Sequence, residues 1–147
     1  RHAYDECAVQ IGLDEACVIN LPSLRSLRHL EGEDRATLKY LLWGDERPPV
    51  SVHEPEGAPA PSSVPDVIIQ VVDATAPKRH LELTLELMQL SRPLVIALNK
   101  MDDARDNGFH ISSNVLSRRL GLPVVATAAI NFAGRCESRT RLIFRSA

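Results

Sequence analysis

Three short apolar runs, separated by segments with helical periodicity, constrain the fold of this chain more than any other feature. The runs cover residues 67–72, 94–98 and 124–126. Leucine and methionine recur near helical spacing from about 77 to 90, and a second helical segment near 115–120 ends at Gly121. Near-continuous apolar strands that alternate with helices are typical of a parallel sheet covered on both faces. The sequence therefore predicts an α/β fold.

The residues before these runs predict a β-hairpin and one helix. Residues 6–11 and 16–19 have the composition of strands, and a tight turn over 12–15 joins them. A helix is expected over 33–43, because its first two residues are acidic, which suits a helix N-terminus, and Gly44 suits its end.

A proline-rich segment over 45–65 lies between this helix and the first apolar run. Its prolines and glycines exclude a helix or a central strand, so we expect a mobile surface loop within one partial domain over 1–134. Residues 135–147 are expected to form a basic C-terminal tail, either solvated or in contact with anionic lipid. Its arginines are Arg135, Arg139, Arg141 and Arg145, against the single acidic residue Glu137.

Composition argues against several classes of protein. The formal net charge of -2 and the aromatic content of 4% give neither a basic face nor a stacking platform, so nucleic acid is not an expected partner. The longest purely apolar run, 94–98, is far shorter than the ~20 residues that span a bilayer. Three cysteines without CxxC spacing, and histidines without a partner at ligand spacing, predict no metal site.

The strongest chemical signal is the tetrapeptide Asn99-Lys100-Met101-Asp102, which begins where a predicted strand ends. Parallel sheets bind ligands at the carboxyl ends of their strands. Asp102 can accept hydrogen bonds from two ring-edge donors of guanine that adenine does not offer. Asn99 can tie loops together and reach the ring, and the stem of Lys100 can cover the ring face. The alternative is a helix N-cap, because Asp102 precedes a polar helical stretch.

Four segments of the chain resemble the FeoB ferrous-iron transporter family. They are residues 65–75, 81–87, 93–102 and 121–125. The Asn-Lys-x-Asp tetrapeptide resembles the guanine-specificity motif of GTPases. The loop Thr127-Ala128-Ala129, one strand later, resembles their Ser-Ala-x loop, whose backbone N–H contacts the guanine oxygen.

This resemblance implies a Ras-like domain of the P-loop-NTPase type, a doubly wound sheet with helices on both faces. It implies that the domain binds GTP or GDP and regulates Fe²⁺ uptake by a membrane transporter domain of the same protein. The location implied is the cytoplasmic face of the bacterial inner membrane. The first strand and the phosphate loop of such a domain are not present here, because no GxxxxGK[ST] occurs in the sequence.

A second departure lies at Asn20-Leu21-Pro22-Ser23, where the family reads Asp-Leu-Pro-Gly. We interpret this segment as a degenerate second switch. Neutral Asn20 replaces the carboxylate that would hold Mg²⁺ through water, and Ser23 has a Cβ where close approach to phosphate is needed. Binding of Mg²⁺ is therefore doubtful, no catalytic residue is assigned, and GTP hydrolysis is expected to be weak or absent.

Two other functions stay open at this point. One is a degenerate, non-hydrolysing G domain that acts as a protein-interaction module. The other is a different doubly wound protein, such as a flavodoxin-like receiver, although the acidic cluster of a receiver is absent.

The absent first strand also bears on assembly. In a Ras-like order it would lie between the return strand of the hairpin and the strand over 67–72, so both would have unpaired edges. Direct pairing of the two strands, a strand upstream of Arg1, or a strand borrowed from another copy would satisfy them. We expect the last of these, a homodimer that exchanges sheet elements.

Overall fold

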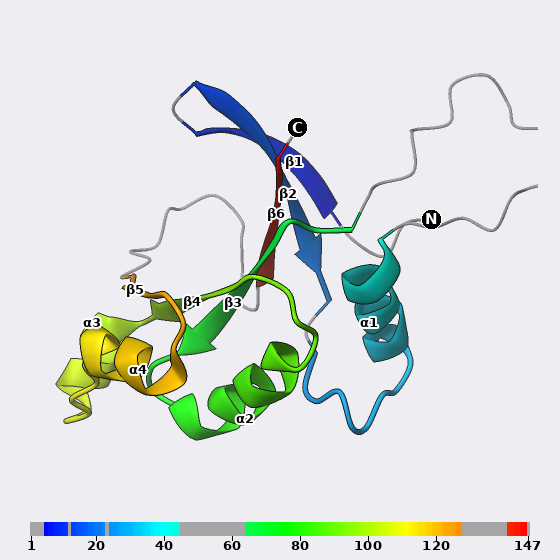
Figure 1. The fold of residues 1–147 in the computed structure, drawn as a ribbon. Coiled ribbons are helices and arrows are strands. Elements are labelled where there is room, and N and C mark those ends of the chain that lie inside the picture. Colours follow the sequence, from blue (N-terminus) through cyan, green and yellow to red (C-terminus); the bar gives the residue numbers. More distant parts are fainter. Residues whose placement is uncertain (1–4, 12, 23, 45–63, 128–140, 147) are drawn as a thin grey trace, which may run out of the picture.

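The computed structural model describes residues 5–11, 13–22, 24–44, 64–127 and 141–146. These residues form one mixed sheet of six strands in the order β1-β2-β6-β3-β4-β5, together with four helices (Figure 1). The strands are β1 (Asp5–Ile11), β2 (Asp14–Leu21), β3 (Val67–Asp73), β4 (Leu94–Asn99), β5 (Val124–Ala126) and β6 (Arg141–Ser146). The helices are α1 (Glu33–Trp43), α2 (Pro77–Met88), α3 (Met101–Asp106) and α4 (Ser113–Leu120).

The predicted hairpin is confirmed. Strands β1 and β2 pair antiparallel from Asp5↔Asn20 to Ile11↔Asp14, so only two residues separate the strands, fewer than the expected turn over 12–15. The predicted helix over 33–43 is confirmed with the same bounds, as α1.

Strands β3, β4 and β5 are parallel neighbours, as the three apolar runs predict. The register of β3 and β4 runs from Ile68↔Leu94 to Asp73↔Asn99, and that of β4 and β5 ends at Leu98↔Ala126. The carboxyl ends of these strands therefore meet at one edge of the sheet.

Strand β6 occupies the place between the hairpin and β3. It pairs antiparallel with β2 over six residue pairs, from Ala16↔Ser146 to Leu21↔Arg141. Its pairing with β3 is much shorter and consists of Val67↔Phe144 and Ile68↔Ile143. The expected basic tail therefore contains a strand, which fills the gap that we expected a partner chain to fill. Residues 135–140 and 147 of that tail lie outside the described residues, as does most of the proline-rich segment.

The described helices all pack on one face of the sheet (Figure 1). On β3 and β4 the buried residues alternate with partly exposed ones, and the buried set faces the helices. Helices α1 and α2 cover Ile68 and Leu94, while α3 and α4 cover Val72, Ile96 and Leu98. Within the described part of the chain, the second helical layer that the pattern predicts is not present.

One buried polar network fixes α2 to the sheet. Gln70 of β3 is completely buried, and its Nε2 donates to the carbonyl of His80 at 2.9 Å. The hydroxyl of Thr84, also completely buried, donates to Gln70 Oε1 at 2.7 Å. Buried polar groups are stable only when they are hydrogen-bonded, so this network sets the position of α2 along β3.

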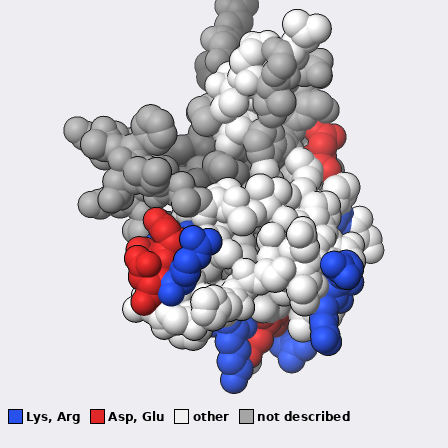
Figure 2. Space-filling view, turned by 90° about the vertical axis from the view of Figure 1, so that its left-hand side faces the viewer, with Lys and Arg blue, Asp and Glu red and all other residues white. Residues whose placement is uncertain are grey.

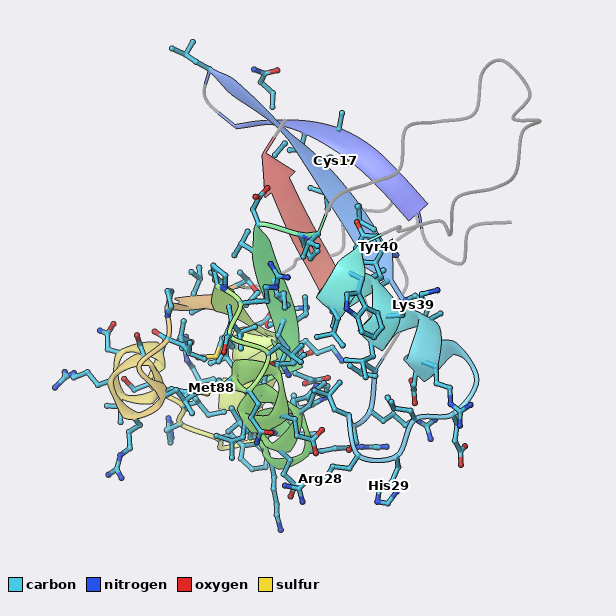
Figure 3. The ribbon with its side chains drawn as sticks, turned by 45° about the vertical axis from the view of Figure 1, so that its right-hand side comes forward. Cys17, Arg28, His29, Lys39, Tyr40 and Met88 are labelled. Carbon is cyan, nitrogen blue, oxygen red and sulfur yellow. The ribbon has the colours of Figure 1, made fainter. Side chains whose placement is uncertain are left out.

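The loop between β2 and α1 is held by a carboxylate of α2. The backbone N–H of Leu27 donates to Glu86 Oε2 at 2.6 Å, and the hydroxyl of Ser26 donates to both carboxylate oxygens at 3.1 Å. The guanidinium of Arg28 lies 3.4 Å from the same carboxylate and is mostly exposed (Figure 3). On α1, buried Tyr40 points to the sheet while Lys39 faces solvent (Figure 3).

Candidate functional site

The candidate site is built at the carboxyl ends of β3, β4 and β5. Two backbone bonds hold these ends in line: the N–H of Ala74 donates to the Asn99 carbonyl at 2.9 Å, and the N–H of Thr127 donates to the Leu98 carbonyl at 2.8 Å. Asp73, Asn99 and Thr127 therefore lie on one row across three strands, as their positions in the sequence predict.

The side chains of Thr127 and Asn99 link the last two of these strand ends. The Thr127 hydroxyl lies 3.3 Å from the Leu98 carbonyl and 3.5 Å from Asn99 Oδ1. The side chain of Asn99 therefore lies next to the end of β5, and its expected role in tying the loops together stays a prediction.

Lys100 turns the chain from β4 into α3. It has a left-handed backbone conformation (φ 60°, ψ 40°), which is uncommon for a residue with a Cβ, and it occupies the N-cap position without a side-chain cap bond. Asp102 lies in the first turn of α3 and is exposed. The N-cap position therefore belongs to Lys100, and the carboxylate of Asp102 faces solvent at the strand ends.

Asp73 is a member of this site to which the sequence assigned no role. Its Oδ2 lies 2.8 Å from the ammonium of Lys100. Its Oδ1 accepts from both the N–H and the hydroxyl of Thr75, at 2.9 and 2.6 Å. The position of Asp73 directly after an apolar run was the only signal available in the sequence, because the contact with Lys100 depends on the strand register and on the path of the lysine side chain.

These contacts stabilise the charged forms of both Asp73 and Lys100. Partial burial alone raises the pKa of Asp73, but hydrogen bonds from Lys100 and Thr75 outweigh it, so the pKa is lowered from its ordinary value. The hydrogen bond to Asp73 is the main reason that the pKa of Lys100 is raised, with a smaller contribution from Asp103.

The second group of predicted residues lies apart from this site. Asn20 and Leu21 end β2, followed by Pro22, and two strands, β6 and β3, separate β2 from β4. The remaining predicted residues, Ser23, Ala128 and Ala129, lie outside the described residues.

Charges are unevenly distributed over the surface near α3 and α4. Figure 2 shows Asp and Glu side chains at several places along the margin of the face, with Lys and Arg side chains at the same margin, while its middle carries no charged side chain. Within the described ranges, no group of three or more His, Cys, Asp or Glu could hold a metal ion. No helix among those same residues is long and apolar enough to cross a membrane.

Comparison with known sequences places this chain beside one family. The sequence model of the family described as ferrous iron transport protein B matches residues 61–140. The Fe(2+) transporter FeoB of Escherichia coli (strain K12) is 45% identical over 115 residues, which are 76% of this chain and 12% of that protein. The Fe(2+) transporter FeoB of Salmonella typhimurium (strain LT2) is 47% identical over 115 residues, with the same two shares. The chain thus spans 12% of the length of these curated relatives.

Solved structures agree with this assignment. The FeoB G domain from Methanococcus jannaschii is 29% identical with a TM-score of 0.66, and the match covers 88% of this chain and 69% of that one. The cytosolic domain of T. maritima FeoB in a GDP form is 26% identical with a TM-score of 0.67, covering 85% and 42%. The mGMPPNP-bound NFeoB from S. thermophilus is 31% identical with a TM-score of 0.61, covering 85% and 41%. These matches confirm the predicted fold class.

Proposed function

Since this chain belongs to the ferrous iron transport protein B family, we propose that it binds a guanine nucleotide through the base half of a GTPase-type site and serves ferrous iron uptake. One observation carries the proposal: Asn99 ends β4, Lys100 and Asp102 follow it, and Thr127, which follows β5, lies next to Asn99. Two solved relatives are described as GDP and mGMPPNP forms, which supports the same class of ligand.

The donors and acceptors at this edge fit a guanine base. The exposed carboxylate of Asp102 would accept from the two donors on the guanine edge, and the N–H groups of the loop over 127–129 would face the guanine oxygen. Asn99 would hold the two loops at a fixed separation. Loss of a hydrogen bond to a charged group typically costs about 1.5–3 kcal/mol of binding free energy. Asp102 would therefore supply most of the discrimination against adenine.

The residues present do not fit the phosphates equally well. Phosphates in such folds lie on a glycine-rich loop between the central strand and the N-terminus of a following helix. Here the strand beside β3 is β6, which runs antiparallel, so its amino end and not its carboxyl end is directed toward this edge. Asn20 is neutral where the family has a metal-binding carboxylate. We therefore expect weak nucleotide binding, poor retention of Mg²⁺, and GTP turnover near background.

A specificity switch at Asp102 tests the proposal. Titration with fluorescent GDP and ADP should show a preference for GDP. Asp102→Asn should lower GDP affinity on the order of tenfold and favour the xanthine nucleotide, because an amide offers the acceptor and the donor that the xanthine edge requires. Asp106→Asn, which removes one charge from the same helix, is the matched control and should bind like the original chain. Equal affinity of the original chain for GDP and ADP would reject the proposal.

The cellular role of the chain follows from its relatives and is part of the same proposal. Their printed names describe Fe(2+) transporters, of which this chain matches a small share. We place the chain at the cytoplasmic face of the bacterial inner membrane, where the membrane transporter domain of the same protein would be its partner. Asp102→Asn in the whole transporter should then change ferrous iron uptake, with Asp106→Asn as its control.

The pairing of β6 supports a second proposal, a homodimer in which two copies exchange this strand. Strand β6 pairs with only two residues of β3 but with six of β2, and residues 128–140 connect it to β5. The β6 of another copy can make the same pairs, and exchange of an identical element is a low-cost route to a dimer. In that case the chain would act as an interaction module, the alternative to nucleotide binding. Light scattering over a concentration series should show a dimer, and a strictly monomeric 16.2 kDa species would exclude it.

A further inference from the structure

We infer that Asp73 is a positioning residue for purine binding, which holds Lys100 across the ends of β3 and β4 so that the lysine stem forms a fixed wall for the ring. The inference rests on the proposed nucleotide site and adds to it a residue outside the Asn-Lys-x-Asp tetrapeptide. Asp73 would touch no part of the ligand and would act through Lys100 alone.

The carboxylate of Asp73 is itself held in place. Both donors of Thr75 bind one of its oxygens, at 2.9 and 2.6 Å, which fixes the plane of the carboxylate and directs the other oxygen outward. That second oxygen receives the Lys100 ammonium at 2.8 Å. The anchor of Lys100 is therefore a rigid group at the end of a buried strand.

Strand order determines where the lysine stem runs. β4 lies between β3 and β5, so an ammonium bound to Asp73 at the end of β3 draws the side chain away from β5. The stem would then lie along the row of strand ends and leave Asp102 and Thr127 open to the edge of a base. The lysine side chain is 51% exposed and, without Asp73, would move among many rotamers.

The energetic consequence is preorganisation. A long side chain that must be ordered on binding lowers affinity, and a side chain that is already ordered does not. The wall formed by an aliphatic stem does not distinguish purines, since it meets the ring face and not its edge. Loss of Asp73 should thus weaken GDP and ADP by the same factor, whereas loss of Asp102 changes their ratio.

A double-mutant cycle separates this role from a structural one. Asp73→Asn keeps the size and the acceptor for Thr75 but loses the charge, and Lys100→Met keeps the stem but loses the ammonium. Each should weaken GDP and ADP binding by about three- to tenfold, and the double variant should be no worse than either single variant. Asp106→Asn controls for the change in net charge, and thermal unfolding of each variant controls for the fold.

The possible outcomes have distinct meanings. No preference for GDP in the original chain rejects the proposed site as a whole. A preference for GDP together with unchanged binding by Asp73→Asn, or additive losses in the double variant, overturns the role of Asp73 alone. Equal losses for both purine nucleotides, with no further loss in the double variant, support it.

Discussion

At the scale of single residues, Asp73 and Lys100 mark how far the sequence could define the site. Asn99, Lys100 and Asp102 could be predicted because their motif begins where an apolar strand ends. The contact of Asp73 with Lys100 could not, because it requires the register that sets Asp73 beside Asn99 and a lysine that reaches back to β3. A motif defines the types of residue present, whereas neighbours from other strands depend on the assembled sheet.

The same pair predicts a pH dependence of stability. The folded-state pKa of Asp73 is lowered. Its contribution to the free energy of unfolding is therefore present above the unfolded-state pKa and is lost as the pH falls through the folded-state pKa. The folded-state pKa of Lys100 is raised, so its contribution is present below the unfolded-state pKa and is lost only in strong base. The carboxylate of Asp103 also contributes to the raised pKa of Lys100.

We therefore expect Asp73→Asn to lower the free energy of unfolding by about 0.5 kcal/mol near pH 7, the range of a half-exposed ion pair. The difference from the original chain should shrink as the pH falls below the ordinary range of an aspartate, and it should vanish only below the lowered pKa of Asp73 in the folded state. Urea unfolding at pH 3, 5 and 7 measures this. A difference that persists undiminished at pH 3 would contradict the assigned ion pair.

At the scale of elements, apolar content decided which parts of the fold could be predicted. β3, β4 and β5 contain near-continuous apolar residues, and α1 has acidic residues at its start and Gly44 at its end. β6 has an apolar centre of three residues between arginines, so the basic composition of the region indicated a tail. Its strand structure comes from the open edges of β2 and β3, which are a property of the sheet and not of the segment.

The loop after β2 gives a prediction at this scale. Glu86 holds this loop through Ser26 and the N–H of Leu27, so Glu86→Gln removes the charge of an acceptor that carries several bonds. We expect hydrogen exchange at the Leu27 amide to become about tenfold faster, with much smaller changes in α1. NMR measures the hydrogen-exchange rate of the Leu27 amide directly. Glu82→Gln, an exposed position on the same helix, should leave exchange in the loop unchanged.

At the scale of the whole molecule, β6 joins the hairpin to the rest of the sheet. Within the sheet, hydrogen bonding connects β2 to β3 through this strand, because it lies between them. The family match covers the parallel half of the sheet and ends at residue 140, just before β6 begins. The hairpin and the candidate site therefore belong to one sheet through a strand outside the matched segment.

A proline in β6 tests this connection. Ile143 pairs with both Ile19 and Ile68, and a proline there has no N–H to donate and does not fit a central strand. We expect Ile143→Pro to lower the free energy of unfolding by about 2 kcal/mol or more, measured by urea titration. Ala58→Pro, in the proline-rich segment, is the control for a general effect of proline. Equal stability of the two variants would show that β6 contributes little in solution.

The position of β6 also determines the order in which the chain can fold. The pairs that join β2 to β6, such as Ala16 with Ser146, connect residues from opposite ends of the described sequence. Such distant contacts form slowly, because a long loop must close before any pairing stabilises it. The alternating strands and helices between Val67 and Ala126 are close in sequence and can assemble early. The hairpin would then dock last, and until it does its edges stay open to pairing with other chains.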